Sequence, residues 1–444
     1  MTAFTADAVR ALGGPEWFVA QRMEAFDRFS ASALPTEAEE IWRYSGIDRF
    51  DLDRFAPVSS SGPGSDVTAA HKVADRLGDH AALVVTRNGV VVSIEAGAGV
   101  PGDVVRVAGS GPLATPMAPL ALGEADGEDA FSLLHHAFVA DIVTIDVPAR
   151  VALEAPVVVV HLCDVAEADE DSAPAVFPHT VVTLGEGAAA GVVEVVVAPA
   201  THGHAALVVP VSQLDVGERA RLAYANLQVL SPAATHIGRQ TSRVAGHGEF
   251  RSFTVGLGGA YARVRTDSDL VGEGGRSSLL AAYLGTGAQV HDFRTLQDHH
   301  APRTESELLF TGAVADHARS VYSGLIRIRR GARRADARQT NHNLVLSEGA
   351  HADSVPNLDI DENDVKCSHA STVGPIDEEQ RYYLESRGIE PAVAERLIVR
   401  GFFSDLAARS PFADVGRWVE ASVEERLIGR LPAETDAEME PIHG

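Results

Sequence analysis

The sequence has little of three residue types: cysteine, lysine and the aromatics. Its 444 residues include two cysteines, Cys163 and Cys367, two lysines, Lys72 and Lys366, and 6% aromatic residues. The two cysteines could form a disulfide, but free thiols are the simpler interpretation because proteins of the reducing cytosol rarely hold disulfides. The scarcity of aromatics argues against an enzyme that binds sugars along an aromatic groove.

Long apolar runs and a surplus of positive charge are also absent. The longest apolar runs, such as residues 155–160, fall far short of the roughly 20 residues that a membrane span needs. The net charge of −25 argues against nucleic acid and an anionic membrane surface as partners, since both attract basic faces. Residues 1–18 hold no basic segment followed by an apolar one, so no signal peptide is predicted. We expect a soluble, cytoplasmic protein.

Changes in the residue pattern divide the chain into five predicted regions. The boundaries follow the alternation between helical periodicity and short valine-rich runs. In order, the regions are an N-terminal helical region and linker (1–68), a mixed α/β connecting region (69–139), a strand-rich core (140–374), a C-terminal helical domain (375–432) and an acidic tail (433–444) that we expect to be disordered.

Local signals place several elements within these regions. Thr36 and Glu39 form a capping-box pattern, which predicts a helix that starts near Thr36. Asn88-Gly89 between two valine-rich runs predicts a hairpin. In the C-terminal region, Asp377 is a candidate helix cap, Gly388 a helix stop and Pro391 the first turn of a second helix.

The strand-rich region contains a glycine-alanine repeat that points to a solenoid. Similar segments occur at residues 312–316, 331–336 and 349–353, with their glycines 19 and 18 residues apart. A period near 20 residues with glycine at the corners predicts stacked rungs, each of two strands and two turns. The predicted fold is therefore mainly β, a right-handed parallel β-helix flanked by N-terminal and C-terminal helical regions. A β-sandwich or jelly roll is the alternative, since short strands alone do not distinguish them.

Signatures of common enzymes and metal sites are missing. The chain has no GxxxxGK[ST], GxSxG or HExxH pattern. His291, His299 and His300 could supply imidazoles to a metal, but no cysteine is near them and we predict surface or turn positions. A calcium-loop-like start at 359–364 lacks the glycine that such a loop needs. Cys163 follows a largely apolar run and is predicted to be a buried, structural thiol.

The segment 363–374, NDVKCSHASTVG, is chemically the most distinctive. It brings a thiol, an imidazole and an ammonium within four positions, where the strands give way to helices. In a strand, Cys367 and His369 point to the same face. Thiolate and imidazole suit iron–sulfur species, and Lys366 could lower the thiol pKa although it should point to the opposite face. Since a cluster usually needs about four ligands, another chain or labile ligands would have to complete a site here.

This segment, with the YYLESRGI that follows and the N-terminal PTEAEEIWRY, resembles the SufB/SufD family of iron–sulfur assembly scaffolds. The resemblance is strongest from Gln339 to Phe402, and the CSH tripeptide and low cysteine content are closest to SufD. It departs at Ala370-Ser371, where the family more often has Gly-Ala. The resemblance implies a non-enzymatic scaffold with a β-helix core between helical regions.

The same resemblance implies partners and a site. The family pairs a SufD-like with a SufB-like chain through their β-helices, and docks the SufC ATPase on helices that correspond to residues 377–431. Its interface cysteine and histidine map onto Cys367 and His369, at which an iron–sulfur cluster would be held transiently and shared with SufB. Flavin involvement and homodimer formation by the isolated chain stay open. The alternatives are a SufB-like paralogue, a carbohydrate-active β-helix enzyme and a purely structural homodimeric solenoid.

Overall fold

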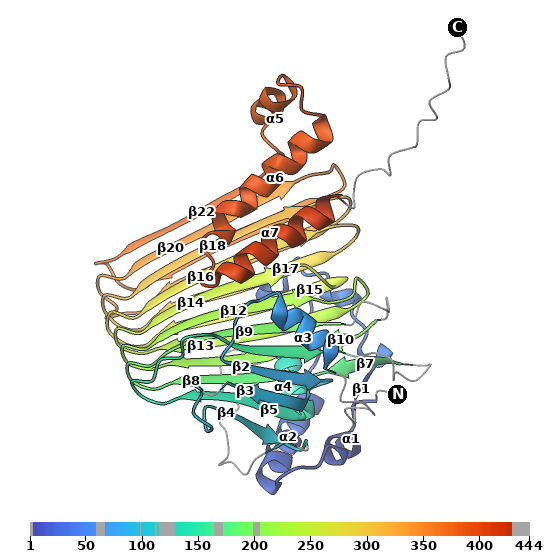
Figure 1. Cartoon of the computed structure of the whole chain (residues 1–444), viewed down its shortest axis with the longest axis vertical. Coiled ribbons are helices and arrows are strands. Elements are labelled where there is room, and N and C mark those ends of the chain that lie inside the picture. The colour runs from blue at the N-terminus through green and yellow to red at the C-terminus, as the bar shows by residue number, and fades with distance from the viewer. Residues whose placement is uncertain are drawn as a thin grey trace.

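The computed structural model describes residues 3–58, 67–97, 99–111, 113–114, 129–163, 172–198 and 205–428. It confirms the mainly β fold: two long sheets face each other as a β-helix, with helices at both ends of the chain (Figure 1). Residues 433–444 and the acidic stretch 167–171 lie outside the described residues, as does most of the expected linker.

The chain alternates between the two sheets, so neighbouring strands within a sheet belong to successive circuits. In the first sheet the order from the C-terminal end is β21 (His351–Ile360), β19 (Arg319–Ile328), β17 (Val290–His299), β15 (Tyr261–Leu270), β13 (Thr235–Val244), β11 (Val211–Val216), β8 (His179–Leu184), β5 (Asp141–Val147) and β4 (Val105–Gly109). In the second sheet it is β22 (Lys366–Gly374), β20 (Asp336–Val345), β18 (Glu305–Val314), β16 (Arg276–Gly285), β14 (Glu249–Gly256), β12 (Arg221–Val229), β9 (Ala189–Val197), β6 (Val157–Leu162), β2 (Ala82–Arg87) and β3 (Val90–Ala96).

Short strands β1 (Phe55–Pro57), β7 (Ala173–Val176) and β10 (Leu207–Val208) join the first sheet at its side. Pairing along the solenoid is parallel, whereas β4 with β5 and β2 with β3 are antiparallel at the N-terminal end. The β2–β3 turn confirms the expected hairpin: Asn88 and Gly89 both have positive φ, the geometry that makes Asn-Gly favourable in a two-residue hairpin.

The predicted 20-residue period is wrong, because one circuit is longer. Tyr261 pairs with Val290 and Arg319 with His351, so a circuit takes 29 residues at the first pair and 32 at the second. Each circuit has two strands of about ten residues and two turns, as expected. The repeated glycines are about half a circuit apart and do not occupy equivalent turns: Gly331 follows β19 and Gly349 follows β20. Gly312 itself lies inside β18, against the ring of Tyr283.

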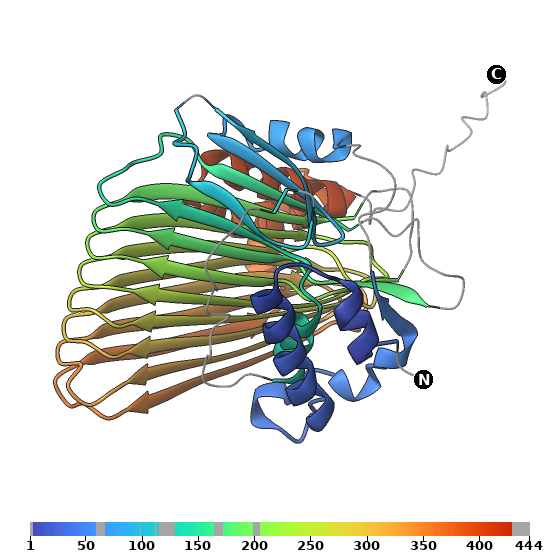
Figure 2. The ribbon, with the colours of Figure 1, turned by 90° about the horizontal axis from the view of Figure 1, so that it is seen from below.

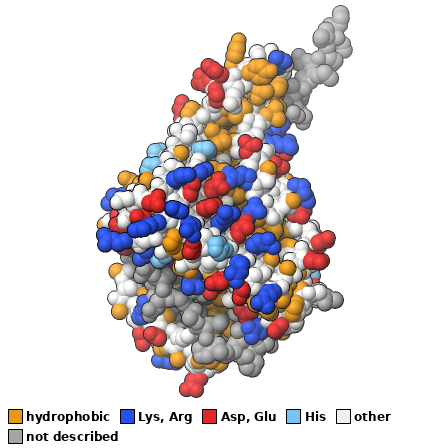
Figure 3. Space-filling view, turned by 90° about the vertical axis from the view of Figure 1, so that its left-hand side faces the viewer, with side chains coloured by type: hydrophobic (Ala, Val, Ile, Leu, Met, Phe, Trp, Pro, Cys, Tyr) orange, Lys and Arg blue, Asp and Glu red, His pale blue; other side chains and the backbone are white. Residues whose placement is uncertain are grey.

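The turns that lead into the second sheet repeat one backbone conformation at the left edge of Figure 1. Arg219, His247 and Arg303 take positive φ there, and each backbone N–H donates to a carbonyl of the next turn. Figure 3 shows this face, where basic and acidic side chains are interleaved. Arg219 pairs with Glu186 of the neighbouring turn at 2.5 Å. The stacked turns thus continue the ladder of hydrogen bonds beyond the strands.

Helices cover both sheets (Figure 2). Helices α3 (Thr68–Asp75), α6 (Pro391–Ala407) and α7 (Ala413–Ile428) pack against the second sheet, and α4 (Ala130–Phe138) lies against the first beneath α1 (Ala6–Ala11) and α2 (Glu16–Ala31). Val415, Val419 and Val423 of α7 are buried against the second sheet.

The C-terminal helices begin and end where the sequence predicts. The Asp377 carboxylate accepts from the Glu379 and Gln380 backbone N–H groups and caps α5 (Glu378–Glu385). Gly388 has φ +84°, which suits glycine at a helix end, and Pro391 opens α6. Helix α5 has no buried residue and stands beyond the last strands at the top of Figure 1.

The helix predicted from Thr36 does not form. The Glu39 side chain accepts a hydrogen bond from the Thr36 backbone N–H, as in a capping box. Only three short 3₁₀ turns follow: η1 (Glu40–Trp42), η2 (Ile47–Arg49) and η3 (Leu52–Arg54). Tertiary contacts decide this, because two arginines of the first sheet take the carbonyls of Ile41 and Arg43 that a helix would have used. We call residues 37–55 the N-terminal strap. Trp42 is buried, whereas Tyr44 is 44% exposed.

Candidate functional site at the open end of the β-helix

The last circuit of the β-helix leaves its inner face uncovered. Within the described part of the chain, β21 and β22 each have a neighbour on one side only, so a row of backbone N–H and C=O groups is unpaired on each. Leu358, Ile360 and Val373 lie on these strands and are 38–44% exposed. An exposed strand edge with apolar side chains is a template for pairing with another chain.

Cys367 and His369 lie on this uncovered inner face. Their partners in β20 are Ala337 and Gln339, both buried between the sheets. Ser371, two residues further along β22, shares a 2.7 Å hydrogen bond with Ser354 of β21 across the space between the sheets. The predicted common face for the thiol and the imidazole is therefore the inside of the solenoid, at its open end.

The two side chains differ in exposure. Cys367 is half-buried against a small cluster that includes Ile328, Ala335 and Ala337, whereas His369 is exposed. Burial, and then the nearby Asp336 carboxylate, raise the pKa of the Cys367 thiol. The lowering that Lys366 could have caused is not found. At neutral pH the thiol is protonated, and a metal ion would have to displace its proton on binding.

Among the described residues, no third metal-binding side chain lies within reach of both Cys367 and His369. Their single group of three metal-binding side chains within reach of one another is Asp269, Asp298 and His300, on the outer face of the first sheet. Arg329 binds both oxygens of Asp298 there, at 2.9 and 2.8 Å, so the carboxylate already has a cationic partner. Cys367 and His369 thus form an incomplete donor set within the described parts of the chain.

The expectation for two of the three histidines is wrong. His291 and His299 are fully buried inside the β-helix, and His300 alone is partly exposed. Burial lowers the pKa of His291 to about 3 and that of His299 to about 4. His299 bonds Thr304 and Ser306, whereas neither ring nitrogen of His291 has a hydrogen-bond partner among the described residues.

The interior also holds an ionisable network that sequence reasoning missed. His161 lies 2.9 Å from an oxygen of Glu194, and Ser212 and Tyr224 donate to the other oxygen. Burial alone would raise the pKa of Glu194, but these hydrogen bonds outweigh it and lower the pKa. The alternation of side chains along a strand could have revealed this buried carboxylate, because Val192, Glu194 and Val196 share one face of β9 and both valines are buried.

Cys163 has the predicted structural role. Its side chain is 1% exposed among apolar neighbours, and burial raises the pKa of its thiol to about 12. Neither cysteine is in a disulfide. Of the two thiols, the one at the open end is the one that another molecule can reach.

A family model described as "SUF system FeS cluster assembly, SufBD core domain" matches residues 165–402. This segment contains most of the β-helix, the Cys367/His369 pair and the start of the C-terminal helices. The chain belongs to the SufBD family. It is 28% identical to the iron–sulfur cluster assembly protein SufD of Escherichia coli over 412 residues, which cover 92% of this chain and 93% of that one. Membership supports a scaffold role in iron–sulfur cluster assembly.

Two further relatives agree with this assignment. An iron–sulfur cluster assembly SufBD family protein of Mycobacterium tuberculosis is 36% identical over 220 residues, 48% of this chain, and the match spans about half (55%) of that relative's length. SufD of Bacillus subtilis is 29% identical over 301 residues, 68% of this chain and 67% of that one. In the described ranges no helix is both long and apolar enough to cross a bilayer.

Proposed function

We propose that this chain is a non-catalytic scaffold subunit of an iron–sulfur assembly complex, in which Cys367 and His369 supply two of the ligands to a transient cluster. The single observation that carries the proposal is the position of the pair on the inner face of the last strand, where the described residues do not complete a set of three ligands. A second subunit that caps this end would complete both the strand pairing and the ligand set.

The partner proposed for the open end is a SufB-like chain. Its own terminal strands would pair with β21 and β22 and extend both sheets by main-chain hydrogen bonds. The exposed Leu358, Ile360 and Val373 would become buried in the same step. In the absence of that partner, two copies of this chain could pair through the same edges as a homodimer.

The partner proposed for the C-terminal helices is a SufC-like ATPase. Tyr382 and Tyr383 of α5 are 73% and 56% exposed, and Leu397 of α6 is 43% exposed. Exposed aromatic residues on a projecting helix are typical of interface anchors. ATP hydrolysis by the docked subunit would shift the two scaffold chains and open or form the shared site. We place the assembly in the cytoplasm, where both thiols stay reduced.

The test is co-expression of this chain with SufB-like and SufC-like subunits, followed by anaerobic purification and absorption spectroscopy. Cys367→Ser and His369→Ala should each reduce the iron–sulfur absorption of the complex several-fold without loss of subunit co-purification. Ser368→Ala is the matched control, because Ser368 is an exposed neighbour on the opposite face of the same strand. Wild-type cluster content in both site variants would exclude the pair as ligands.

A further inference from the structure

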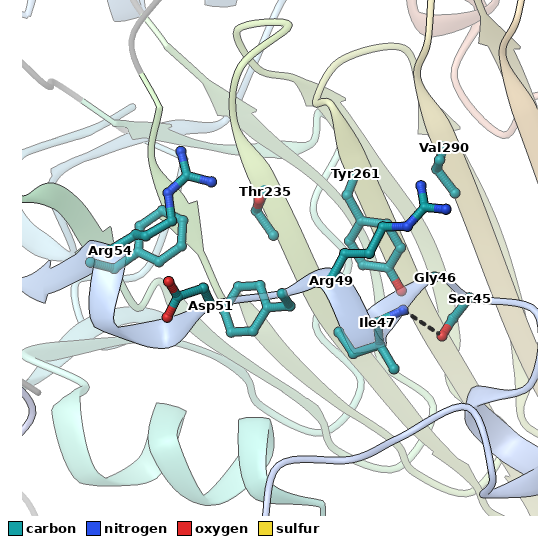
Figure 4. A pocket seen from close by; sticks show the side chains of 11 residues that line it. Ser45, Gly46, Ile47, Arg49, Asp51, Arg54, Thr235, Tyr261 and Val290 are labelled. Carbon is teal, nitrogen blue, oxygen red and sulfur yellow. Dashed lines mark hydrogen bonds between the residues drawn. The ribbon is translucent and has the colours of Figure 1, made fainter.

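The N-terminal strap borders a half-open cavity of about 220 Å³ against the outer face of the first sheet, and Cys367 is not part of its lining. Strap residues between Ser45 and Phe55 form one wall (Figure 4). Thr235, Tyr261 and Val290 form the floor; they pair in register as the first residues of β13, β15 and β17. The cavity therefore exists only because the strap is held across three strands.

Buried charges hold the strap in place. Arg263 and Arg294 donate to the Asp292 carboxylate and also to strap carbonyls, those of Ile41 at 2.8 Å and Arg43 at 2.7 Å. The Tyr261 hydroxyl is also directed to Asp292, at 3.3 Å. This network fixes one wall of the cavity relative to the other, so the cavity is preorganised.

Two arginines at the cavity have no partner among the described residues. Figure 4 shows Arg49 and Arg54 at opposite ends of it, both on the strap. Neither guanidinium has an ion pair or a hydrogen bond to any described residue, although most buried and many exposed arginines of this chain pair with carboxylates. Asp51 is the acidic residue of the lining, and its carboxylate accepts from the Asp53 backbone N–H. Two guanidinium groups against one carboxylate leave the cavity positively charged, which favours an anionic group in a ligand.

The rest of the lining combines polar groups, those of Ser45, Asp51 and Thr235, with flat apolar side chains. The rings of Phe50 and Phe55 are stacked, with centroids 5.8 Å apart and planes 11° from parallel. Ile47 is 4% exposed, and Val290 adds an aliphatic surface. Such walls suit a planar ring, and the volume lies below the roughly 300–1,000 Å³ of pockets for drug-sized ligands.

The geometry points to a binding site for a small aromatic anion, a single ring that carries a phosphate or a carboxylate. The ring packs against the aromatic wall, and the anion accepts hydrogen bonds from Arg49 or Arg54 or both. This inference does not depend on the proposed cluster site, because the cavity shares no residue with the open end of the β-helix.

The test is isothermal calorimetry of the full chain with four probes. Phenyl phosphate and benzoate combine ring and anion, whereas inorganic phosphate and phenol each supply one feature alone. At least one combined probe should bind about tenfold more tightly than both single-feature probes, and the better of the two identifies the anion. If neither phenyl phosphate nor benzoate binds more tightly than inorganic phosphate and phenol, the inference is wrong.

Substitutions then locate the site. Arg49→Ala and Arg54→Ala should each weaken binding of the better probe about fivefold, as expected for loss of one partly exposed charge-assisted hydrogen bond. Arg10→Ala is the matched control: Arg10 is also exposed and N-terminal but lies in α1, where it pairs with Asp7. Binding to the Arg49→Ala/Arg54→Ala double variant as tight as to the wild type would also overturn the proposal. Circular dichroism checks that each variant is folded.

Discussion

Asp292→Asn should release the N-terminal strap. The Asp292 side chain is fully buried, and it neutralises Arg263 and Arg294, whose side chains are 2% and 5% exposed. Asparagine keeps the size of the side chain but removes its charge. Two buried guanidiniums would then lack a counter-charge, which is one of the few single changes expected to cost several kcal/mol.

The magnitude follows from the contacts that remain. Loss of one partner of a buried pair typically costs about 3–5 kcal/mol. Here Arg263 keeps the Ile41 carbonyl and the ring of Trp42, 3.7 Å from its guanidinium carbon, and Arg294 keeps the Arg43 carbonyl. These contacts place the cost at the lower end, about 3 kcal/mol. The population with an open strap should then rise about 100-fold, at about 1.4 kcal/mol per factor of ten.

Limited trypsin digestion measures this population. Arg43, Arg49 and Arg54 are exposed strap residues at which trypsin could cut once the strap opens. When opening and closing are fast, the cleavage rate follows the open population, so cleavage within the strap should rise up to about 100-fold in Asp292→Asn. N-terminal sequencing of the fragments identifies the cut sites.

A matched control removes an exposed ion pair from the second sheet, away from the strap. Glu305 pairs with Arg276, and both side chains are more than half exposed. Glu305→Gln should change stability by at most about 1 kcal/mol and leave strap cleavage unchanged. Strap cleavage of Asp292→Asn within threefold of the wild-type rate would refute the reasoning that buried charges hold the strap.

Three further predictions concern the interior and the thiols. The pKa of His291 is about 3 in the folded protein and about 6.5 in the unfolded protein, so the unfolded state binds more protons between these values and stability falls as the pH drops. The free energy of unfolding, measured with urea, should therefore fall by about 1.4 kcal/mol less between about pH 7.5 and pH 5.5 in His291→Leu than in the wild type. Gly312→Ala should cost about 2 kcal/mol or more, because the new Cβ would lie 1.9 Å from the Tyr283 ring. Maleimide should label only Cys367 in the native protein, because Cys163 is buried, and should label both thiols in the denatured protein.

Each of these has its own control. An unchanged pH dependence in His291→Leu would show that this histidine binds its proton equally well in the folded and unfolded protein, which would contradict the lowered pKa. Gly401→Ala, on α6 with open space around the added Cβ, should be neutral or slightly stabilising, so equal losses at Gly401 and Gly312 would contradict the steric argument. Labelling of two thiols in the native state would mean that Cys163 is accessible.

The strength of the sequence predictions differs between local and non-local features. The caps of α5 and α6 were correct because Asp377, Gly388 and Pro391 act on residues within a turn of themselves. The predicted period near 20 residues was wrong because Gly312, Gly331 and Gly349 are similar in sequence but occupy different places in the circuit. Local similarity does not reveal which strand pairs with which.

The same distinction explains the histidines and the strap. His291 and His299 look like surface residues in a polar stretch, yet in-register pairing directs them between the sheets. The capping pattern at Thr36 was real, but Arg263 and Arg294, more than 200 residues away, bind the carbonyls that a helix would use. Tertiary hydrogen bonds overrode a weak local preference.

The amino-acid sequence by itself determined the alternation that makes strands, the helix ends and the shared face of Cys367 and His369, since each depends on neighbours a few positions away. Only the tertiary structure decided the circuit length, the polar interior and the place of that pair at an uncovered end. Parallel strands pair with residues some 30 positions distant, and the register that results is a property of the whole stack.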